Sequence, residues 1–584
     1  MKYLYSIFSF LLLLATNLHS EDFDVNSLPK LLGSSNAGTE FYFTFVPGIE
    51  TSCCDLKLYI SCNIRTKVTV EVPSKGYTKT KYTIPNEIIE FTLAPAVGQV
   101  YRKIERDIPK RDSVWEKAAV HVIADDPIIC YSAKRYQYNG SGFLNLPVDI
   151  LGNEYLISAY NDPGNNTNMF FPAYAGISAV YDNTEIQFIM GGTENSKTSG
   201  GLLPGNDTIY FLNKSDVLLI SSLGKLSDLS GSRVISSKPI SVVTGNFCAF
   251  ITDSNSNCDI TEEMEIPTYA WGETYHVTPI FGRKKNSIIR IYAKKPMTNI
   301  MRDGKYLGTI RTAGGIEGVG YLHLRADEGE PRPIVISGDK PISVTQYNPG
   351  TTDDSVTSDP FQMTLLPTEL YQREIIFHTP GIRGGYGFPY NYINLCYESD
   401  GFGNIPDDIE IAFYNYKDSV FEWHRLKDTL GTQGQPFYKN FGDRQFSFTT
   451  FLLPGDGVYK IRAEKPFQAY MYGFSSYDSY GMPASVYLDS VKYNDRPKKP
   501  EKNYFEIFPN PATDELTIRT NIGFEQESRI EIFDLLGKLL YSESELFRIR
   551  TDKKIDLRSF SSGVYYIQIS TGKEVFTEKF FVVR

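Results

Sequence analysis

Histidines and nucleophiles do not combine into a known hydrolytic motif in this sequence. Five of the six histidines follow the first twenty residues: His121, His276, His323, His378 and His424. A serine or cysteine nucleophile needs a histidine base and a third group that orients it. The chain has no Gly-x-Ser-x-Gly elbow and no His-Glu-x-x-His zinc pair. Because each histidine lies in an alternating, strand-like run, we expect strand side chains and no catalytic role.

Paired carboxylates are the other chemistry to consider, since a glycosidase needs two acids at a suitable separation in space. Four acidic clusters occur: Asp125-Asp126, Glu262-Glu263 with Glu265, Asp353-Asp354 with Asp359, and Asp407-Asp408. Asp126 precedes a proline of a repeat described below, so we interpret it as structural. The three glutamates are the strongest candidates, yet we predict that the protein is not an enzyme. A secreted carbohydrate-active hydrolase is the alternative.

Two oxygen-rich stretches could hold a structural calcium ion. They run from Asp253 to Asp259 and from Asp353 to Asp359, and neither has the ligand spacing of an EF-hand. We therefore expect solvated loops and no cofactor, with calcium as the alternative.

The seven cysteines suggest one disulfide. Cys248 and Cys258 bracket a polar loop and are predicted to pair in an oxidising compartment. Cys62 has three possible partners, and the sequence does not choose among Cys53, Cys54 and Cys130. The odd count leaves at least one cysteine outside the disulfides, for which Cys396 is the best candidate. Buried reduced thiols are the alternative throughout. No metal site is expected, because adjacent Cys53-Cys54 lacks the spacing of zinc ligands.

Composition and pattern favour strands. Aromatic residues make up 14% of the chain, with 40 Tyr and 37 Phe, and such side chains pack well on pleated surfaces. Short alternating runs, such as residues 56–64, 67–72 and 287–293, are separated by Gly, Pro, Asn and Asp. This pattern predicts an all-β protein of tandem sandwich-like modules. The formal net charge of −10 argues against a nucleic-acid partner.

A repeat positions these strands. The segments ADDPIICYSA, SSKPISVVTG, GDKPISVTQY and AEKPFQAYMY begin at Ala124, Ser236, Gly338 and Ala463. In each, we expect one strand to end before the charged residue and a second strand to begin at the proline, where the missing N–H costs no ladder bond. A second proline-containing element follows each copy. The repeat predicts a row of four modules, at about 38–147, 148–267, 268–367 and 368–490.

The two ends of the chain have other features. Lys2 followed by an apolar run to Ala15 predicts a secretory signal peptide over residues 1–20. Residues 491–503 are charged and interrupted by proline, which is typical of a linker. Residues 504–584 form a final compact segment, for which we predict a small immunoglobulin-like sandwich with Gly537 at a positive-φ turn position and Gly563 at the start of a strand.

This final segment resembles the type A C-terminal sorting domain of type IX secretion cargo over essentially its whole length. The positions that carry the resemblance are Pro509, Asn510, Pro511, Asp514, Gly537, Gly563, Tyr565 and Lys579. The resemblance implies contact with the type IX machinery, passage through the periplasm and across the outer membrane, and removal of the domain. The body would then be attached to surface lipopolysaccharide or released.

Residues 38–490 resemble the N-terminal domain family of the IgG Fc-binding protein, most specifically over 228–279. The matching positions include Asp228, Gly231, Lys238, Pro239, Pro267, Trp271, Gly272 and Tyr275. The resemblance implies a secreted recognition domain and does not imply antibody binding. We interpret Trp271 as a core aromatic, since large aromatics usually pack inside sandwiches. The sequence thus predicts a secreted or surface-attached adhesion protein for an extracellular glycoprotein or polysaccharide, with a structural surface-layer role as a further alternative.

Overall fold

The computed structural model describes residues 36–488 and 504–584, apart from short gaps. The gaps fall at residues 49–53, 104–105, 137, 163–168, 253–256, 326–330, 386, 403, 431–436, 442–444, 476–477, 522–525, 548–551 and 572–574. The predicted signal peptide and linker lie outside the described residues.

Each proline of the repeat lies inside one long strand in the middle of a sheet. These strands are β7 (Val120–Arg135), β14 (Arg233–Ala249), β21 (Ile334–Asn348) and β29 (Val458–Phe474). The predicted break into two strands is therefore wrong. In β7, the pairing with β1 shifts register between Gly38 and Glu40, so Pro127 has no ladder partner in β1. A bulge of this kind accommodates the proline without ending the strand.

Four antiparallel sheets follow one another along the chain, all sandwich-like and all built on a long strand. The first contains, besides β7, the strands β1 (Ala37–Phe43), β2 (Asp55–Ser61), β3 (Lys67–Val72), β4 (Tyr77–Tyr82), β5 (Ile88–Leu93) and β8 (Gly140–Leu144). The second contains, besides β14, the strands β6 (Ser113–Trp115), β9 (Gly152–Leu156), β10 (Ala173–Ala179), β11 (Thr184–Ile189), β12 (Asp207–Leu212), β13 (Val217–Ser221) and β15 (Asp259–Met264). The second sheet thus takes β6 from the segment predicted as the first module.

The third and fourth sheets repeat this arrangement. The third contains, besides β21, the strands β16 (Gly272–Val277), β17 (Ile288–Ala293), β18 (Thr298–Arg302), β19 (Lys305–Ile310), β20 (Tyr321–Arg325) and β22 (Phe361–Thr364). The fourth contains, besides β29, the strands β23 (Gln372–His378), β24 (Tyr392–Glu398), β25 (Glu410–Asn415), β26 (Val420–Arg425), β27 (Phe437–Asn440), β28 (Phe446–Leu452) and β30 (Ser479–Pro483).

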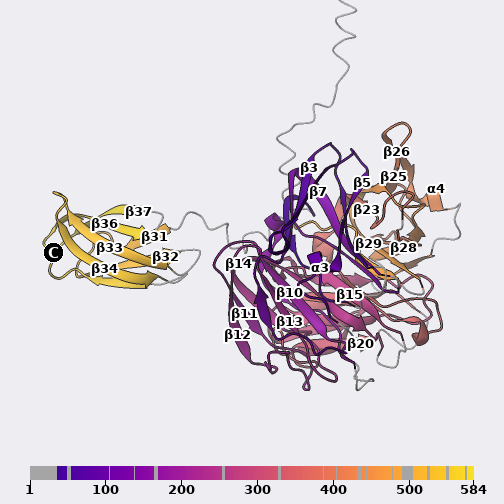
Figure 1. The fold of residues 1–584 in the computed structure, drawn as a ribbon, viewed down its shortest axis with the longest axis horizontal. Coiled ribbons are helices and arrows are strands. Elements are labelled where there is room, and N and C mark those ends of the chain that lie inside the picture. Colours follow the sequence, from indigo (N-terminus) through magenta and orange to yellow (C-terminus); the bar gives the residue numbers. More distant parts are fainter. Residues whose placement is uncertain are drawn as a thin grey trace, which may run out of the picture.

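The four sheets close into a ring instead of forming an open row. One strand of each sheet, β8, β15, β22 and β30, contacts its counterpart in the next sheet, and β30 returns to β8. We call these four the inner strands. All residues of the inner strands are buried. Both faces of each inner strand are therefore covered, and the neighbouring sheets provide this cover. In Figure 1 the indigo first sheet accordingly lies beside the orange fourth sheet.

Among the residues that the structure describes, helical structure is confined to short connections. They are α3 (Pro95–Gly98), α4 (Leu426–Leu430) and the 3-10 turns η1 (Pro73–Lys75), η2 (Val148–Ile150), η3 (Thr268–Ala270), η4 (Thr351–Asp353) and η5 (Thr368–Leu370). Three of these turns, η2, η3 and η5, begin directly after Pro147, Pro267 and Pro367. No helix within the described ranges is long and apolar enough to cross a bilayer.

The C-terminal segment is a two-sheet sandwich, as predicted. One sheet contains β31 (Tyr504–Phe508), β32 (Glu515–Asn521) and β35 (Asp552–Asp556). The other contains β33 (Gln526–Asp534), β34 (Leu539–Phe547), β36 (Gly563–Thr571) and β37 (Val575–Val582). Its core includes Phe505, Leu516, Ile532 and Phe580, all from this segment. The segment therefore has a hydrophobic core of its own.

Candidate functional site

All five histidines lie in strands, as predicted from their alternating contexts. His121 contacts Glu71 through Nδ1 at 2.8 Å and Glu40 through Nε2 at 3.0 Å. Burial lowers the pKa of His323 to about 3 and that of His378 to about 4. These two imidazoles are therefore neutral at physiological pH. His378 is fully buried, whereas His323 is partly exposed.

The three glutamates that were the strongest catalytic candidates are buried and join neighbouring strands. Glu262 accepts a hydrogen bond from the backbone N–H of Val46 and lies 2.9 Å from Lys134 Nζ. Glu263 accepts one from the N–H of Thr364 in β22.

Glu265 accepts hydrogen bonds from the Ser158 N–H, the Ser158 hydroxyl and the Thr244 hydroxyl, at 2.6 to 2.7 Å. Burial raises its pKa to about 7. All three glutamate side chains are thus buried and hydrogen-bonded inside the ring.

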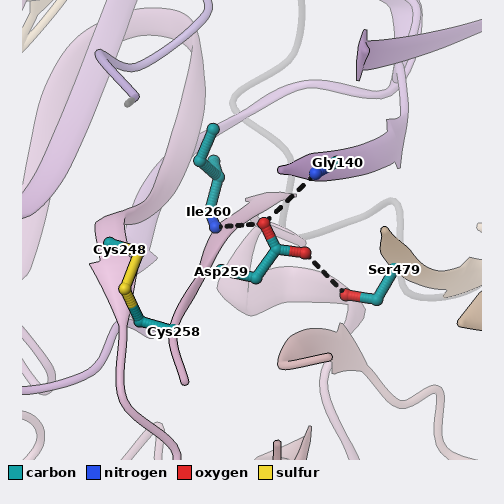
Figure 2. The surroundings of a disulfide bond; sticks show 6 residues. All are labelled: Gly140, Cys248, Cys258, Asp259, Ile260 and Ser479. Carbon is teal, nitrogen blue, oxygen red and sulfur yellow. Dashed lines mark hydrogen bonds between the residues drawn. A yellow bond between two sulfur atoms is a disulfide. The ribbon is translucent and has the colours of Figure 1, made fainter. Parts of the chain in front are cut away.

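Three aspartates mark one end of the inner strands. Asp259, Asp359 and Asp478 occupy equivalent positions at the start of β15, just before β22 and just before β30, as the pairing of these strands with the long strands shows. In the first sheet the equivalent residue is Asn139. Asp259 accepts hydrogen bonds from Gly140 N–H of the first sheet and from the Ser479 hydroxyl of the fourth (Figure 2). It therefore connects three sheets.

The carboxyl groups at this end of the ring resist ionisation. Burial, and then the charges of Asp359 and Asp478, raise the pKa of Asp259 well above its usual range. Burial and Asp478 raise the pKa of Asp359 to about 8. Within the described residues, no group of three His, Cys, Asp or Glu side chains has the geometry of a metal site.

In the second calcium candidate, the stretch from Asp353 to Asp359, the first two aspartates form ion pairs with arginines. Asp353 lies 2.6 Å from Arg325, and Asp354 lies 2.9 Å from Arg283. Residues 253–256 of the first candidate loop fall outside the described residues. Solvated loops without a cofactor stay the prediction at both places, with calcium as the alternative.

The cysteine pattern resolves into one disulfide among the described residues. Cys248 and Cys258 are bonded, as predicted, and the bond precedes Asp259 directly (Figure 2). Cys62 and Cys130 are buried and reduced, so Cys62 pairs with neither Cys130 nor Cys54. Cys396 also carries a buried thiol, which accepts a hydrogen bond from the Tyr371 hydroxyl. Cys53 lies outside the described residues.

Asp228 and Gly231 connect the second and third sheets. Asp228 Oδ2 lies 2.6 Å from Nη1 of Arg290, and both side chains are fully buried. Gly231 has φ +73°, and a Cβ there would lie 2.4 Å from the carbonyl oxygen of Gly315, in the connection between β19 and β20 of the third sheet. Arg290 was not predicted, because its partner lies 62 residues away in the sequence.

Glycine and proline form a contact that recurs within each of the first three sheets. A Cβ on Gly38 would lie 2.3 Å from Pro147, one on Gly152 would lie 2.5 Å from Pro267, and one on Gly272 would lie 2.5 Å from Pro367. In each case the glycine lies at or near the start of a strand (β1, β9 or β16), and the proline follows the inner strand of the same sheet (β8, β15 or β22). Pro267 and Gly272 therefore each take part in a contact that joins the beginning of a sheet to its end.

The remaining residues of the central motif are also structural. Trp271 is 4% exposed and donates from Nε1 to the carbonyl of Ile266. Tyr275 is buried, and its hydroxyl donates to the carbonyl of Ile342 in β21. Lys238, next to Pro239, donates to the carbonyl of Asp182. Each of these three side chains therefore donates to a backbone carbonyl within the fold.

The residues predicted as sorting motif hold the last strand of the terminal sandwich. Asn510, between Pro509 and Pro511, donates to the carbonyl of Lys579 and accepts from the N–H of Phe581. The carbonyl of Asp514 accepts from Leu557, and the Tyr565 hydroxyl donates to Ser561. Gly537 has φ +78° in the β33–β34 turn, and Gly563 begins β36. Both glycines lie as predicted.

The fourth sheet carries a cleft with a volume of about 720 Å³. It lies between the end of β24, the β24–β25 connection, α4 and the proline bulge of β29. Its charged lining residues are Glu398, Asp400, Asp407, Asp408, Glu464, Lys427 and Lys465. Of the four acidic clusters in the sequence, Asp407-Asp408 is the one that borders this cleft.

Comparison with known proteins agrees with this architecture. Residues 141–473 match the model of the IgGFc binding protein family, which is more than half of the chain. The chain belongs to the IgGFc binding protein family. Residues 506–583 match the secretion system C-terminal sorting domain, so the terminal sandwich is a sorting domain of the type IX system. Both assignments agree with the resemblances found in the sequence.

One curated relative is the human IgGFc-binding protein, 24% identical over 248 residues. The match covers 41% of this chain and 4% of the human protein. Among solved structures, dimeric latent PorU from Porphyromonas gingivalis is 11% identical, covers 59% of this chain and 31% of that chain, and has a TM-score of 0.13. The FN1–FN3 domains of chicken CNTN1 are 10% identical, covering 53% of this chain and 99% of that one, with a TM-score of 0.12. These scores are too low to support a common fold.

Proposed function

We propose that this protein is a bacterial surface adhesin, carried out of the cell by type IX secretion, whose ring of sheets binds an extracellular glycoprotein or polysaccharide. The observation that carries the proposal is the pairing of a separately folded sorting domain with a body of the IgGFc binding protein family. A rigid ring suits recognition, because it holds surface loops in fixed positions.

The export route follows from the tail. The signal peptide at residues 1–20 would direct the chain into the periplasm, and the type IX machinery would move it across the outer membrane. Removal of the tail near residues 491–503 would then leave the body attached to surface lipopolysaccharide or released.

Binding is favoured over catalysis by the use of the buried acids. Glu262, Glu263 and Glu265 are committed to contacts inside the ring. The second candidate is a carbohydrate-active hydrolase, which is supported by the Asp407-Asp408 cluster at the edge of the cleft.

A glycan and mucin array with the mature body, run beside a hydrolysis screen on the same ligands, separates these functions. Saturable binding without turnover is the expected result. Release of cleaved sugar would establish the hydrolase, and self-association into ordered layers without ligand binding would establish a surface-layer protein.

A further inference from the structure

The four sheets can be compared at one equivalent corner, where a connection crosses over the proline bulge of the long strand. The connections are β2–β3, β10–β11, β17–β18 and β24–β25, and each joins the two strands that flank the bulge. In the first three sheets they are short, covering residues 62–66, 180–183 and 294–297. In the fourth the connection covers residues 399–409.

The short connections are fastened to the residue before the proline. Lys238 donates to the carbonyl of Asp182, and Lys340 donates to the carbonyls of Pro296 and Met297. In the first sheet the N–H of Asp126 donates to the Thr66 hydroxyl. The corner is therefore closed in three sheets of four.

The fourth corner is open. Lys465 donates instead to Glu398 at the end of β24, and the N–H of Glu464 donates to Asp408 of the long connection. The cleft of about 720 Å³ lies between them. Since three sheets fold with a closed corner, the repeat does not need this cleft for its stability.

The charge of the cleft is negative. Five carboxylates line it against two lysines, which gives a net formal charge of −3. Two of the carboxylates are paired, Glu398 with Lys465 at 2.6 Å and Asp407 with Lys427 at 2.5 Å. The hydrogen bond and charge of Lys427 lower the pKa of Asp407, so this acid is ionised at neutral pH. A cation entering the cleft would therefore meet an attractive field.

The cleft also offers apolar surface. Ile405, Pro406 and Ile409 contribute to its lining, and Phe402 of the same connection is 84% exposed. The stem of a lysine or arginine side chain packs on apolar surface while its charged end contacts carboxylates. An exposed aromatic ring adds a cation–π partner.

We propose that the cleft of the fourth sheet binds a lysine- or arginine-bearing peptide segment of an extracellular protein. This inference rests on the proposed adhesin function and selects the protein part of a glycoprotein as the ligand. A neutral sugar is the weaker candidate, because it would desolvate the carboxylates without offsetting their net charge.

The test uses the full mature chain and a fluorescent peptide of alternating glycine and lysine. We expect the wild-type protein to bind the peptide saturably, and more weakly in high salt. The double variant Asp408→Asn/Glu464→Gln should bind it with about tenfold weaker affinity, because two surface charges are lost. Both substitutions keep a hydrogen-bond acceptor in place. Lys427→Gln should change the affinity in the opposite direction, which separates charge from misfolding.

The matched control is Asp339→Asn, at the position in the third sheet equivalent to Glu464, where the corner is closed. It should bind like wild type. Equal binding of a lysine-acetylated peptide, or equal affinity in the double variant and wild type, would overturn the inference. The inference would also be overturned if the wild-type protein bound neutral oligosaccharides and the double variant did not. Export and surface display would be unaffected by any of these results, so the adhesin proposal is tested separately.

Discussion

The buried pair between Arg290 and Asp228 gives a sharp test of how the ring is held together. Arg290 lies on β17 of the third sheet, and its guanidinium donates to Asp228, to the carbonyl of Ala159 and to the Ser230 hydroxyl, each at 2.6 Å. Burial lowers the pKa of Arg290, but Asp228 and the surrounding tyrosines outweigh it and raise the pKa overall. The arginine is therefore charged within the interface.

Removing one partner should be costly, because the other charge stays buried. We expect Arg290→Met to lower the free energy of unfolding by about 3 to 5 kcal/mol, the usual loss for breaking a buried pair. Asp228→Asn should have an effect of the same sign. The double variant should lose less than the sum of the two, by roughly 0.5 to 3 kcal/mol, because the two residues are in direct contact.

The assay is urea unfolding followed by tyrosine fluorescence and circular dichroism. The matched control is Arg233→Met, which removes an arginine paired with Glu154 in the second sheet at a partly exposed position. Its expected loss is about 0 to 1 kcal/mol. If Arg290→Met and Arg233→Met unfold at the same urea concentration, the pair does not hold the second and third sheets together.

Three further changes test other parts of the ring. The double substitution Cys248→Ser/Cys258→Ser should lower stability under oxidising conditions by about 2.7 kcal/mol, from the unfolded-chain entropy of a loop with separation 10; identical melting of oxidised and reduced wild type would contradict this. The folded protein holds the proton of Asp359 more tightly than the unfolded chain does, because the pKa of Asp359 is raised to about 8. The free energy of unfolding should therefore fall as the pH rises from about 4 to 8, by at most ~1.4 kcal/mol per pH unit for one group. Asp359→Asn should flatten this pH profile, measured by urea unfolding. Gly231→Ala should lower the free energy of unfolding by more than about 1 kcal/mol, because the backbone there has a positive φ and the added Cβ would collide with the Gly315 carbonyl. An unchanged melting temperature would refute this reasoning.

Local pattern was sufficient for much of the architecture. Alternation placed the histidines in strands, and the proline repeat located β7, β14, β21 and β29. The predicted strand break at the proline was wrong, because a bulge keeps the proline out of the β1 ladder while the strand continues. Trp271 was predicted as core from its size and is buried.

Contacts between sheets could not be predicted from the sequence. Lys134 and Glu262 meet across two sheets, and Arg290 meets Asp228 in the same way. Nothing local to either residue indicates its partner, since an isolated Lys or Arg in a strand usually points to solvent. The cleft was missed for a related reason: the length of residues 399–409 matters only in comparison with three shorter connections at the same corner.

The central claim is that the terminal sandwich is an export tag and the ring is its cargo. Intact-mass measurement of the protein recovered from the outer surface of a bacterium with type IX secretion tests it most directly. The account predicts a chain that begins near residue 21 and lacks residues 504–584, with or without an added lipopolysaccharide mass. Recovery of the chain in the periplasm with the tail still attached, in cells that export other type IX cargo, would contradict it.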